Sequence, residues 1–459
     1  MIKVGMVSLG CPKNLVDSEV MLGTLEGKGY ELTPDPADAD VIVVNTCTFI
    51  DPARKESVDT ILEMAEFKKS GRCRRLVVAG CMVQAHHDEL RASIPEIDAL
   101  VGLNDIERIA EACALEAGAR FEAGRGAAEY LYSDRSPRIL ATPGYSAYLK
   151  ISEGCDHTCS FCAIPSFRGV QRSRPIASIV EEAKRLAAQG VVELNLIAQD
   201  TTDYGGDLGD GATPAGLLRA LDTVDGLRWI RVMYAYPNRV THEFIDALAG
   251  GRRIARYLDM PLQHADAEML RVMRRGGSGD AHLRLVESLR ERVPGIALRT
   301  TFIVGFPGET ETQFRTLCGF VETAAFDHMG VFIYSEEKGT PAAALPDDVA
   351  AAVKEERRAR LMGIQEKHLA RRRKALVGRT VEVLVEGPHP ESDLLLAGRM
   401  EGQAPEIDGG VILTDAPRVL YPGEFVSVRI ETAHAHDLVG PVVAVPARPV
   451  GAAAGTAQP

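Results

Sequence analysis

The stretch EGCDHTCSFCAIP at residues 153–165 brings three cysteines into one short loop, directly after the strand-like run YLKIS at 148–152. The three cysteines are Cys155, Cys159 and Cys162. Three thiolates at this spacing can hold a cubane iron–sulfur cluster, which normally takes four cysteines, so one iron stays open to a substrate or cofactor. A zinc site is the alternative. It would need a fourth ligand such as His157, and the spacing differs from the paired Cys-x-x-Cys of zinc ribbons.

This loop follows the first of six strand-like runs, which alternate with helical stretches such as SIVEEAKRLAAQG at 178–190. The six runs lie at 148–152, 192–198, 227–235, 255–261, 296–305 and 328–335. Strands that alternate with helices form parallel sheets, and six repeats predict an open, partial (βα)6 barrel. Ligands bind at the carboxyl ends of such strands, so we expect the cysteine loop at the mouth of the barrel.

Three further cysteines near the N-terminus each end a Val- and Ile-rich run, and they are Cys11, Cys47 and Cys81. Their spacings of 36 and 34 residues each fit one βα unit, which predicts an open parallel α/β sheet. Because the carboxyl ends of parallel strands share one edge, we expect these thiols to converge. The alternatives are ordinary core cysteines, or a zinc site completed by His86, His87 or Cys73. The lone cysteines are predicted to be spare thiols: Cys73, Cys113 and Cys318.

The chain divides into segments by composition and pattern. After the barrel, short strands at regular spacing follow a charged helix and predict a small antiparallel β-barrel. The expected segments are an N-terminal α/β domain at 1–118, a Gly- and Pro-rich linker at 119–140, the barrel at 141–372, the small β-barrel at 373–440 and an unstructured Ala/Pro-rich tail at 441–459.

Composition bounds the class of protein. The 459 residues are 46% hydrophobic and 25% charged, which is typical of globular domains. We find neither a run of 18 apolar residues nor a signal peptide, and so expect a soluble, cytoplasmic protein without membrane contact. The net charge of −12 argues against broad electrostatic binding of nucleic acid. Nine cysteines in such a chain favour metal or redox use over disulfides.

The six clustered cysteines, with Phe161 before the last of them, resemble the radical S-adenosylmethionine methylthiotransferases through roughly residue 440. Within that family the chain is most similar to the branch that modifies an aspartate of small-subunit ribosomal protein twelve. The sister branch, which acts on transfer RNA, usually has Gln-Met-Asn where Pro-Lys-Asn follows Cys11 here. The stretches that carry the resemblance lie at 9–21, 150–174, 196–208, 257–264 and 298–311.

The resemblance implies a transferase of alkylthio groups. Cys155, Cys159 and Cys162 would hold one 4Fe-4S cluster that coordinates S-adenosyl-L-methionine, and Cys11, Cys47 and Cys81 would hold a second. Two S-adenosylmethionine molecules per turnover would methylthiolate the β-carbon of the aspartate, with no catalytic residue beyond the cluster ligands. The electron donor and the sulfur source stay unidentified. The resemblance also implies a UPF0004-like N-terminal domain and a C-terminal TRAM domain.

Two other functions stay open. The first is methylthiolation of adenosine in transfer RNA. The second is a non-enzymatic role, as a cluster-bearing electron carrier or a zinc-bearing RNA-binding module.

Polar and glycine positions at the barrel strands are candidate contacts of S-adenosylmethionine. A zwitterionic cofactor is a natural partner for buried polar groups at strand ends. An aromatic beside a cluster can instead shield it from water, an arginine can pair with a neighbouring carboxylate, and a glycine can mark a strand-to-helix turn. The candidates are Phe161, Gln199, Asp200, Gln263, Arg299 and Gly305.

The charge of the last domain bears on the partner. Residues 379–437 contain eleven carboxylates and four arginines, a balance of −7. A domain that bound phosphates would show the opposite balance. An acidic face favours a basic ribosomal protein, either free or within the ribosomal subunit, over direct binding of nucleic acid as the primary contact. A solvated acidic surface is the simpler alternative. The basic run at 371–374 could contact ribosomal RNA or complement the end of its own helix.

Overall fold

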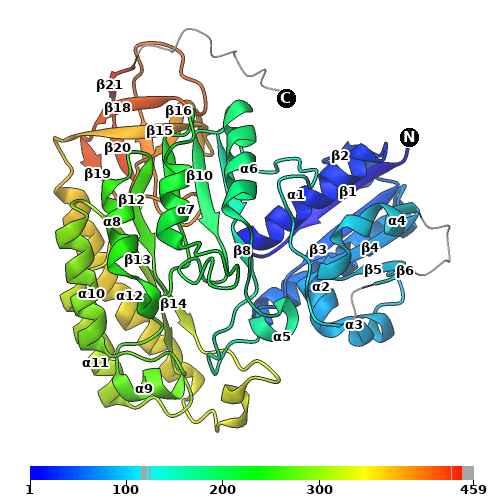
Figure 1. The fold of residues 1–459 in the computed structure, drawn as a ribbon, viewed down its shortest axis with the longest axis horizontal. Helices are drawn as coiled ribbons and strands as arrows, with labels where there is room; N and C mark the ends of the chain where they lie inside the picture. The colour runs from blue at the N-terminus through cyan, green and yellow to red at the C-terminus, as the bar shows by residue number, and fades with distance from the viewer. Residues whose placement is uncertain (115–120, 124–125, 436, 447–459) are drawn as a thin grey trace.

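The computed structural model describes residues 1–114, 121–123, 126–435 and 437–446, which form three regions around separate sheets. In Figure 1 the N-terminal region lies to the right, the barrel to the left and the C-terminal sheet at the top. Within the described residues, no helix is both long and apolar enough to cross a membrane.

The N-terminal region is a six-stranded parallel sheet in the order β2-β1-β3-β4-β5-β6, as the apolar runs predicted. Its strands are β1 (Lys3–Ser8), β2 (Glu31–Thr33), β3 (Val41–Thr46), β4 (Arg75–Gly80), β5 (Ala99–Val101) and β6 (Phe121–Glu122). Its helices are α1 (Pro12–Gly27), α2 (Asp51–Ser70), α3 (Cys81–Ser93) and α4 (Ile109–Ala114), with 3-10 turns at Pro36–Asp38 and Leu103–Arg108.

The central region is a six-stranded, all-parallel sheet in the order β14-β13-β12-β11-β10-β7, which confirms the partial barrel. Its strands are β7 (Ser146–Lys150), β10 (Glu193–Ile197), β11 (Trp229–Val232), β12 (Ile254–Asp259), β13 (Ala297–Val304) and β14 (His328–Ile333). A short hairpin, β8 (Ser152–Glu153) with β9 (Arg172–Ser173), flanks the cysteine loop.

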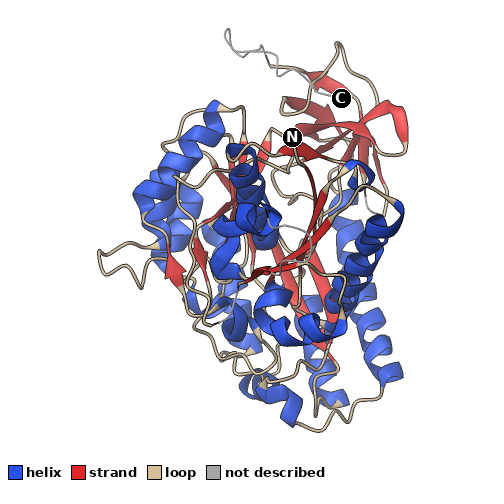
Figure 2. Ribbon diagram, turned by 90° about the vertical axis from the view of Figure 1, so that its right-hand side faces the viewer, coloured by secondary structure: helices blue, strands red, loops and turns tan. Residues whose placement is uncertain are grey.

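Helices cover the outer face of this sheet, and an apolar core fills the space between the two layers (Figure 2). These covering helices are α6 (Ile176–Ala188), α7 (Pro214–Leu221), α8 (His242–Gly250), α10 (Gly279–Arg292), α11 (Glu311–Ala324) and α12 (Ala351–Lys374). The short helix α5 (Ile164–Arg168) contacts α3, and α9 (Ala267–Val272) contributes Met269 to a separate apolar cluster with Phe306. The 3-10 turns lie at Pro237–Arg239 and Pro341–Ala344.

The C-terminal region is a seven-stranded curled sheet in the order β19-β20-β17-β16-β15-β18-β21, antiparallel except for the pair β17 and β20. Its strands are β15 (Thr380–His389), β16 (Ser392–Arg399), β17 (Val411–Leu413), β18 (Phe425–Arg429), β19 (Thr432–Ala433), β20 (Leu438–Gly440) and β21 (Val442–Ala444).

The strand β21 corrects the expected start of the tail at 441. Ser427 and Val428 of β18 pair with Ala444 and Val442, and Val442 is buried in the core of the C-terminal sheet. The valines of this short run therefore complete the edge of the sheet, although their Pro-rich surroundings suggested a tail. The remainder of the predicted tail, 447–459, lies outside the described residues.

The C-terminal sheet packs on the amino ends of the barrel strands, opposite the expected mouth. Arg399 donates to both carboxylate oxygens of Glu193, the first residue of β10, at 3.1 and 2.6 Å. Trp229, the first residue of β11, meets Phe425 edge to face, with 4.8 Å between ring centroids. We call this interface between the C-terminal sheet and the amino ends of the barrel strands the barrel floor.

Several carboxylates of the last domain point toward the barrel, which modifies the expected acidic outer face. Glu382 pairs with Arg228, and Asp408 pairs with Arg299. Part of the negative surplus therefore joins two domains of this chain and is not free to attract a partner.

Candidate functional site

The first cysteine triplet lies at one edge of the N-terminal sheet. Cys11 precedes α1, Cys47 follows β3 and Cys81 begins α3 directly after β4. Close backbone approach makes this possible, because Gly10 has a φ of +88° and an added Cβ there would lie 2.6 Å from the Cβ of Cys47. The three strand ends therefore converge at this edge, as expected.

A buried arginine from the barrel reaches this triplet. Arg168, the last residue of α5, donates to the Sγ of Cys81 at 2.9 Å and to the carboxylates of Glu153 at 2.8 Å and Asp17 at 3.3 Å. Burial raises the pKa of Cys81 to about 12, and Arg168 opposes that shift. The guanidinium therefore stabilises a thiolate at a position where burial alone favours the thiol.

Sequence reasoning missed Arg168. Its only signal is its place three residues after the end of the EGCDHTCSFCAIP stretch, which does not reveal that it points toward the other triplet.

The second triplet lies in the loop between β8 and α5, at the carboxyl end of β7 as expected. Gly154 has a φ of +83°, and a Cβ there would lie 1.9 Å from the carbonyl oxygen of Val170, so the loop closes tightly on the next turn. The Cys155 N–H donates to the Gly169 carbonyl at 3.1 Å. Arg275 points its Nη1 at the Sγ of Cys159, 3.6 Å away. Each triplet therefore has an arginine directed at one sulfur.

Burial also raises the pKa of Cys155 and that of Cys162 to about 12. Charge on the neighbouring cysteines of the loop adds to both shifts. Thiols whose pKa values are raised in this way lose their protons readily when a metal ion binds in place of the protons, which is the behaviour of a metal site.

The spread of the sulfur atoms fits a multinuclear cluster better than a single ion. Tetrahedral zinc with Zn–S bonds of about 2.3 Å sets its sulfurs about 3.8 Å apart. In neither triplet do all three sulfurs lie within 4.8 Å of one another, because the only described group that meets this limit is His157 with Asp200 and Asp203. Cubane iron–sulfur clusters place a larger body between their thiolates than a single ion does, and this spacing leaves room for one.

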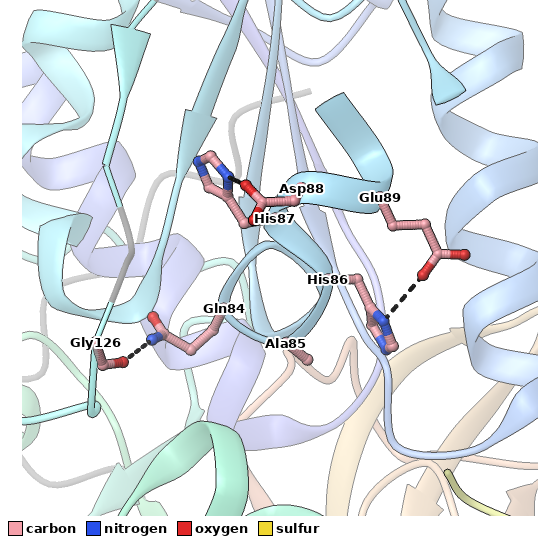
Figure 3. A pocket seen from close by; sticks show the side chains of 7 residues that line it. All are labelled: Gln84, Ala85, His86, His87, Asp88, Glu89 and Gly126. Atoms are coloured by element: carbon pink, nitrogen blue, oxygen red, sulfur yellow. Dashed lines mark hydrogen bonds and ion pairs between the residues drawn. The ribbon is translucent and has the colours of Figure 1, made fainter. Parts of the chain in front are cut away.

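The histidines considered as fourth zinc ligands are engaged elsewhere. His157 bonds Asp200 through Nε2 at 2.6 Å and stacks on Tyr236 with ring centroids 3.8 Å apart. His86 pairs with Glu89 and His87 with Asp88, and both line a separate cavity of about 340 Å³ on α3 (Figure 3). Neither triplet gains a fourth ligand from these residues.

Three of the expected S-adenosylmethionine contacts surround the second triplet. Gln199 donates to Glu153 at 2.6 Å, while its buried Oε1 has no hydrogen-bond partner among the described residues. Asp200 is buried and forms a hydrogen bond with His157, which lies two residues after Cys155 in the chain. Phe161 packs beside the apolar cluster that contains Met273 and Phe306. The buried Oε1 of Gln199 therefore lacks a hydrogen-bond donor within the described part of the chain, and a bound ligand would supply one.

The other three expected contacts have different surroundings. Gln263 has a φ of +72°, and its backbone pairs with β13. The pairing with the sheet is therefore one reason for its backbone conformation. Arg299 bonds Asp408 at 2.7 Å and lies 3.8 Å from Asp259, the carboxylate alternative considered above. Gly305 has a φ of +69°, and a Cβ there would lie 2.3 Å from the side chain of Lys354. The side chain of Lys354 from α12 thus lies against Gly305, and a contact of Gly305 with S-adenosylmethionine stays a prediction.

A buried lysine lies between the two domains, and sequence reasoning did not single it out. Lys13, two residues after Cys11, is 7% exposed, and its Nζ lies 3.1 Å from the centroid of the Tyr234 ring. Tyr234 follows β11 with a φ of +61°, which is uncommon for a bulky residue. Burial lowers the pKa of Lys13 to about 8 and raises that of nearby Asp259 to about 6.

Comparison with known proteins agrees with this geometry. Residues 3–102 match the uncharacterized protein family UPF0004, residues 149–321 the radical SAM superfamily, and residues 377–443 the TRAM domain. The chain is 52% identical over 448 residues to the ribosomal protein uS12 methylthiotransferase RimO of Solibacter usitatus, covering 96% of this chain and 95% of that one. It is also 52% identical to RimO of Myxococcus xanthus, covering 96% and 92%.

Solved structures share the fold. The radical S-adenosylmethionine methyltransferase TsrM from Kitasatospora setae, with cobalamin and a [4Fe-4S] cluster bound, superposes with a TM-score of 0.54 at 19% identity, covering 74% of this chain and 77% of that one. A second structure of that enzyme, with tryptophan and a S-adenosylmethionine analogue, gives a TM-score of 0.51 at 19% identity, covering 72% and 73%.

Proposed function

The chain belongs to the RimO family of ribosomal protein uS12 methylthiotransferases, and on that basis we propose that its two cysteine triplets each hold a 4Fe-4S cluster. The protein is a radical S-adenosylmethionine enzyme that methylthiolates the β-carbon of an aspartate in uS12. The relatives named above are uS12 methylthiotransferases, which favours this reaction over the alternative one on transfer RNA. The use of two clusters and two S-adenosylmethionine molecules per turnover is part of the proposal.

The proposal assigns simple tasks to the side chains. Bound here, the clusters and S-adenosylmethionine would supply the one-electron chemistry that breaks an unactivated C–H bond, which acid–base side chains cannot do. The six cysteines bind iron as thiolates, and Arg168 and Arg275 stabilise one thiolate in each triplet. The Oε1 of Gln199 accepts a hydrogen bond from S-adenosylmethionine. Cys47, Cys81 and Cys159 are buried and the other three cysteines are only partly exposed, which limits the access of water and oxygen to the reacting groups.

One observation carries the proposal, namely the link that Arg168 makes between the two triplets. Arg168 belongs to the helix that follows the Cys155–Cys162 loop, yet its guanidinium bonds Cys81. Arg168 therefore connects the segment that carries the second triplet to a sulfur of the first, which supports a reaction that uses both triplets.

The partner and the place of the reaction complete the proposal. The substrate is uS12, a basic protein, modified free or within the ribosomal subunit. An electron donor and a sulfur source must also reach the site, and the cytoplasm provides ribosomes together with both.

Iron content and product mass test this proposal together. Anaerobically reconstituted protein should bind about eight iron atoms per chain. Replacing Cys11, Cys47 and Cys81 by alanine, or the other three, should leave about four iron atoms and abolish transfer. The product is a gain of one methylthio group on uS12, located by mass spectrometry. Full transfer by a protein with only four irons would contradict the two-cluster arrangement, while unmodified uS12 would reject the function.

A further inference from the structure

Lys13 is a buried cation without a partner in the described part of the chain. Its side chain is nine-tenths buried, and its Nζ has neither a hydrogen bond nor an ion pair with any described residue. The contact that it makes is with the face of Tyr234. A buried ammonium is costly unless an anion accompanies it, and an aromatic face offsets only part of that cost.

The nearby carboxylates are already held by other groups. Asp259 accepts from the Tyr234 N–H at 3.2 Å and faces Arg299 at 3.8 Å. Glu153 is bound by Lys150 at 2.7 Å and by Arg168 at 2.8 Å. Neither lies within 4.0 Å of the Lys13 ammonium, since no such pair occurs among the described residues. Cys11 is the strongest negative influence on Lys13, but its thiolate is assigned to iron, so an anion from outside the chain can still pair with the ammonium.

The position of Lys13 indicates which anion this is. Lys13 lies in the first turn of α1, two residues after Cys11 of the first triplet, and its Nζ lies over the ring of Tyr234 at the carboxyl end of β11. The carboxylate of S-adenosylmethionine is expected at the other triplet. Among the anions of the reaction, the side chain of the target aspartate is the one whose carboxylate carbon is bonded directly to the β-carbon that reacts, so an ion pair with Lys13 would place that carbon near the first triplet.

We propose that Lys13 binds the carboxylate of the substrate aspartate and so holds its β-carbon between the two triplets. This assignment rests on the proposed function. Tyr234 keeps the ammonium in place before substrate arrives, and its positive φ turns the ring toward α1. The ion pair also explains how the enzyme selects aspartate, because the neutral amide of asparagine offers an ammonium a weaker acceptor.

The test compares two forms of uS12, one with aspartate and one with asparagine at the target position. Binding is measured by fluorescence anisotropy with reconstituted enzyme and S-adenosylmethionine but no reductant, so that no turnover occurs. The wild-type enzyme should bind the aspartate form about 10- to 100-fold more tightly, as expected for a charged hydrogen bond. Lys13→Met keeps the apolar stem against Tyr234 and should abolish that preference.

Lys184→Met is the matched control, because Lys184 is 60% exposed on α6, and it should keep the full preference. Iron content shows whether Lys13→Met still folds, and Lys13→Gln carries the same comparison if it does not. A preference that survives loss of the ammonium, or one that is absent from the wild-type enzyme, overturns the role of Lys13. Wild-type enzyme that never methylthiolates uS12 would instead reject the proposed function, so the two failures are distinguishable.

Discussion

At the scale of single residues, buried arginines join distant segments in the interior of this protein. Arg168, Arg231 and Arg399 are all buried and all reach carboxylates. A buried arginine is tolerated only when its hydrogen bonds are satisfied, so each one ties together the segments that supply its partners. The cysteine triplets were predictable because their spacing is visible in the sequence. The arginines were not, since a single Arg carries no local sign of what it will face.

Glu193 yields a prediction about acid stability. Burial would raise its pKa, but Arg399 and Arg231 outweigh burial and lower the pKa to about 2. A carboxyl group with a lowered pKa contributes stability above its ordinary value near 4.5, and that stability is lost as the pH falls toward 2. The contribution is about 3 kcal/mol.

Glu193→Gln should therefore unfold more easily at neutral pH and lose less stability between pH 4.5 and 2 than the wild type. Fluorescence of Trp229, the one tryptophan of the chain, follows this region during urea unfolding. Glu382→Gln is the control, because its pair with Arg228 is half exposed and contributes little. Equal acid sensitivity of Glu193→Gln and wild type would count against the lowered pKa.

At the scale of elements, the strands followed from the sequence and the contacts between domains did not. Runs such as Val41–Thr46 and Ala297–Val304 became parallel strands because they are apolar and bounded by polar turns. The strand Val442–Ala444 was missed since three residues give no periodicity. Arg299 and Gly305 were expected at the cofactor on the strength of their strand, but their nearest contacts are Asp408 and Lys354.

The turn before α1 yields a second prediction. Gly10→Ala places a methyl group 2.6 Å from the Cβ of Cys47 on a backbone with a φ of +88°. Both the clash and the backbone strain should displace Cys11 from the first triplet. The variant should therefore bind about four irons instead of eight.

Gly27→Ala, at the other end of α1, is its control. A Cβ there meets nothing within 4 Å, so iron content should stay at the wild-type level. Cleavage of S-adenosylmethionine to 5′-deoxyadenosine should persist in Gly10→Ala, since the second triplet is untouched. A full complement of iron in Gly10→Ala would show that the turn tolerates the methyl group.

At the scale of the whole molecule, the C-terminal domain is part of the barrel's structure. Asp408, whose side chain is 1% exposed, accepts from Tyr257 at 2.9 Å and from Arg299 at 2.7 Å. Charge counting alone assigned the carboxylates of this domain to an external partner. The count was correct, but a net charge does not say which way a side chain points.

Removal of this domain is the third prediction. A chain that ends at Lys374 leaves Glu193 and Arg231 without Arg399 and uncovers Trp229. Breaking a buried ion pair costs about 3–5 kcal/mol. The shortened protein should therefore melt at a lower temperature and aggregate, as measured by light scattering during a thermal scan. A soluble fragment with the melting temperature of the full chain would show that the domain is an independent module.

The pair of Glu193 and Arg399 spans 206 residues of sequence, and that separation sets the order in which the protein can mature. During translation Glu193 leaves the ribosome long before Arg399 exists. The floor of the barrel can close only after the last domain has been synthesised. Before that moment the barrel that carries the metal-binding loops is incompletely folded. The factors that deliver iron should therefore act on the polypeptide after its release.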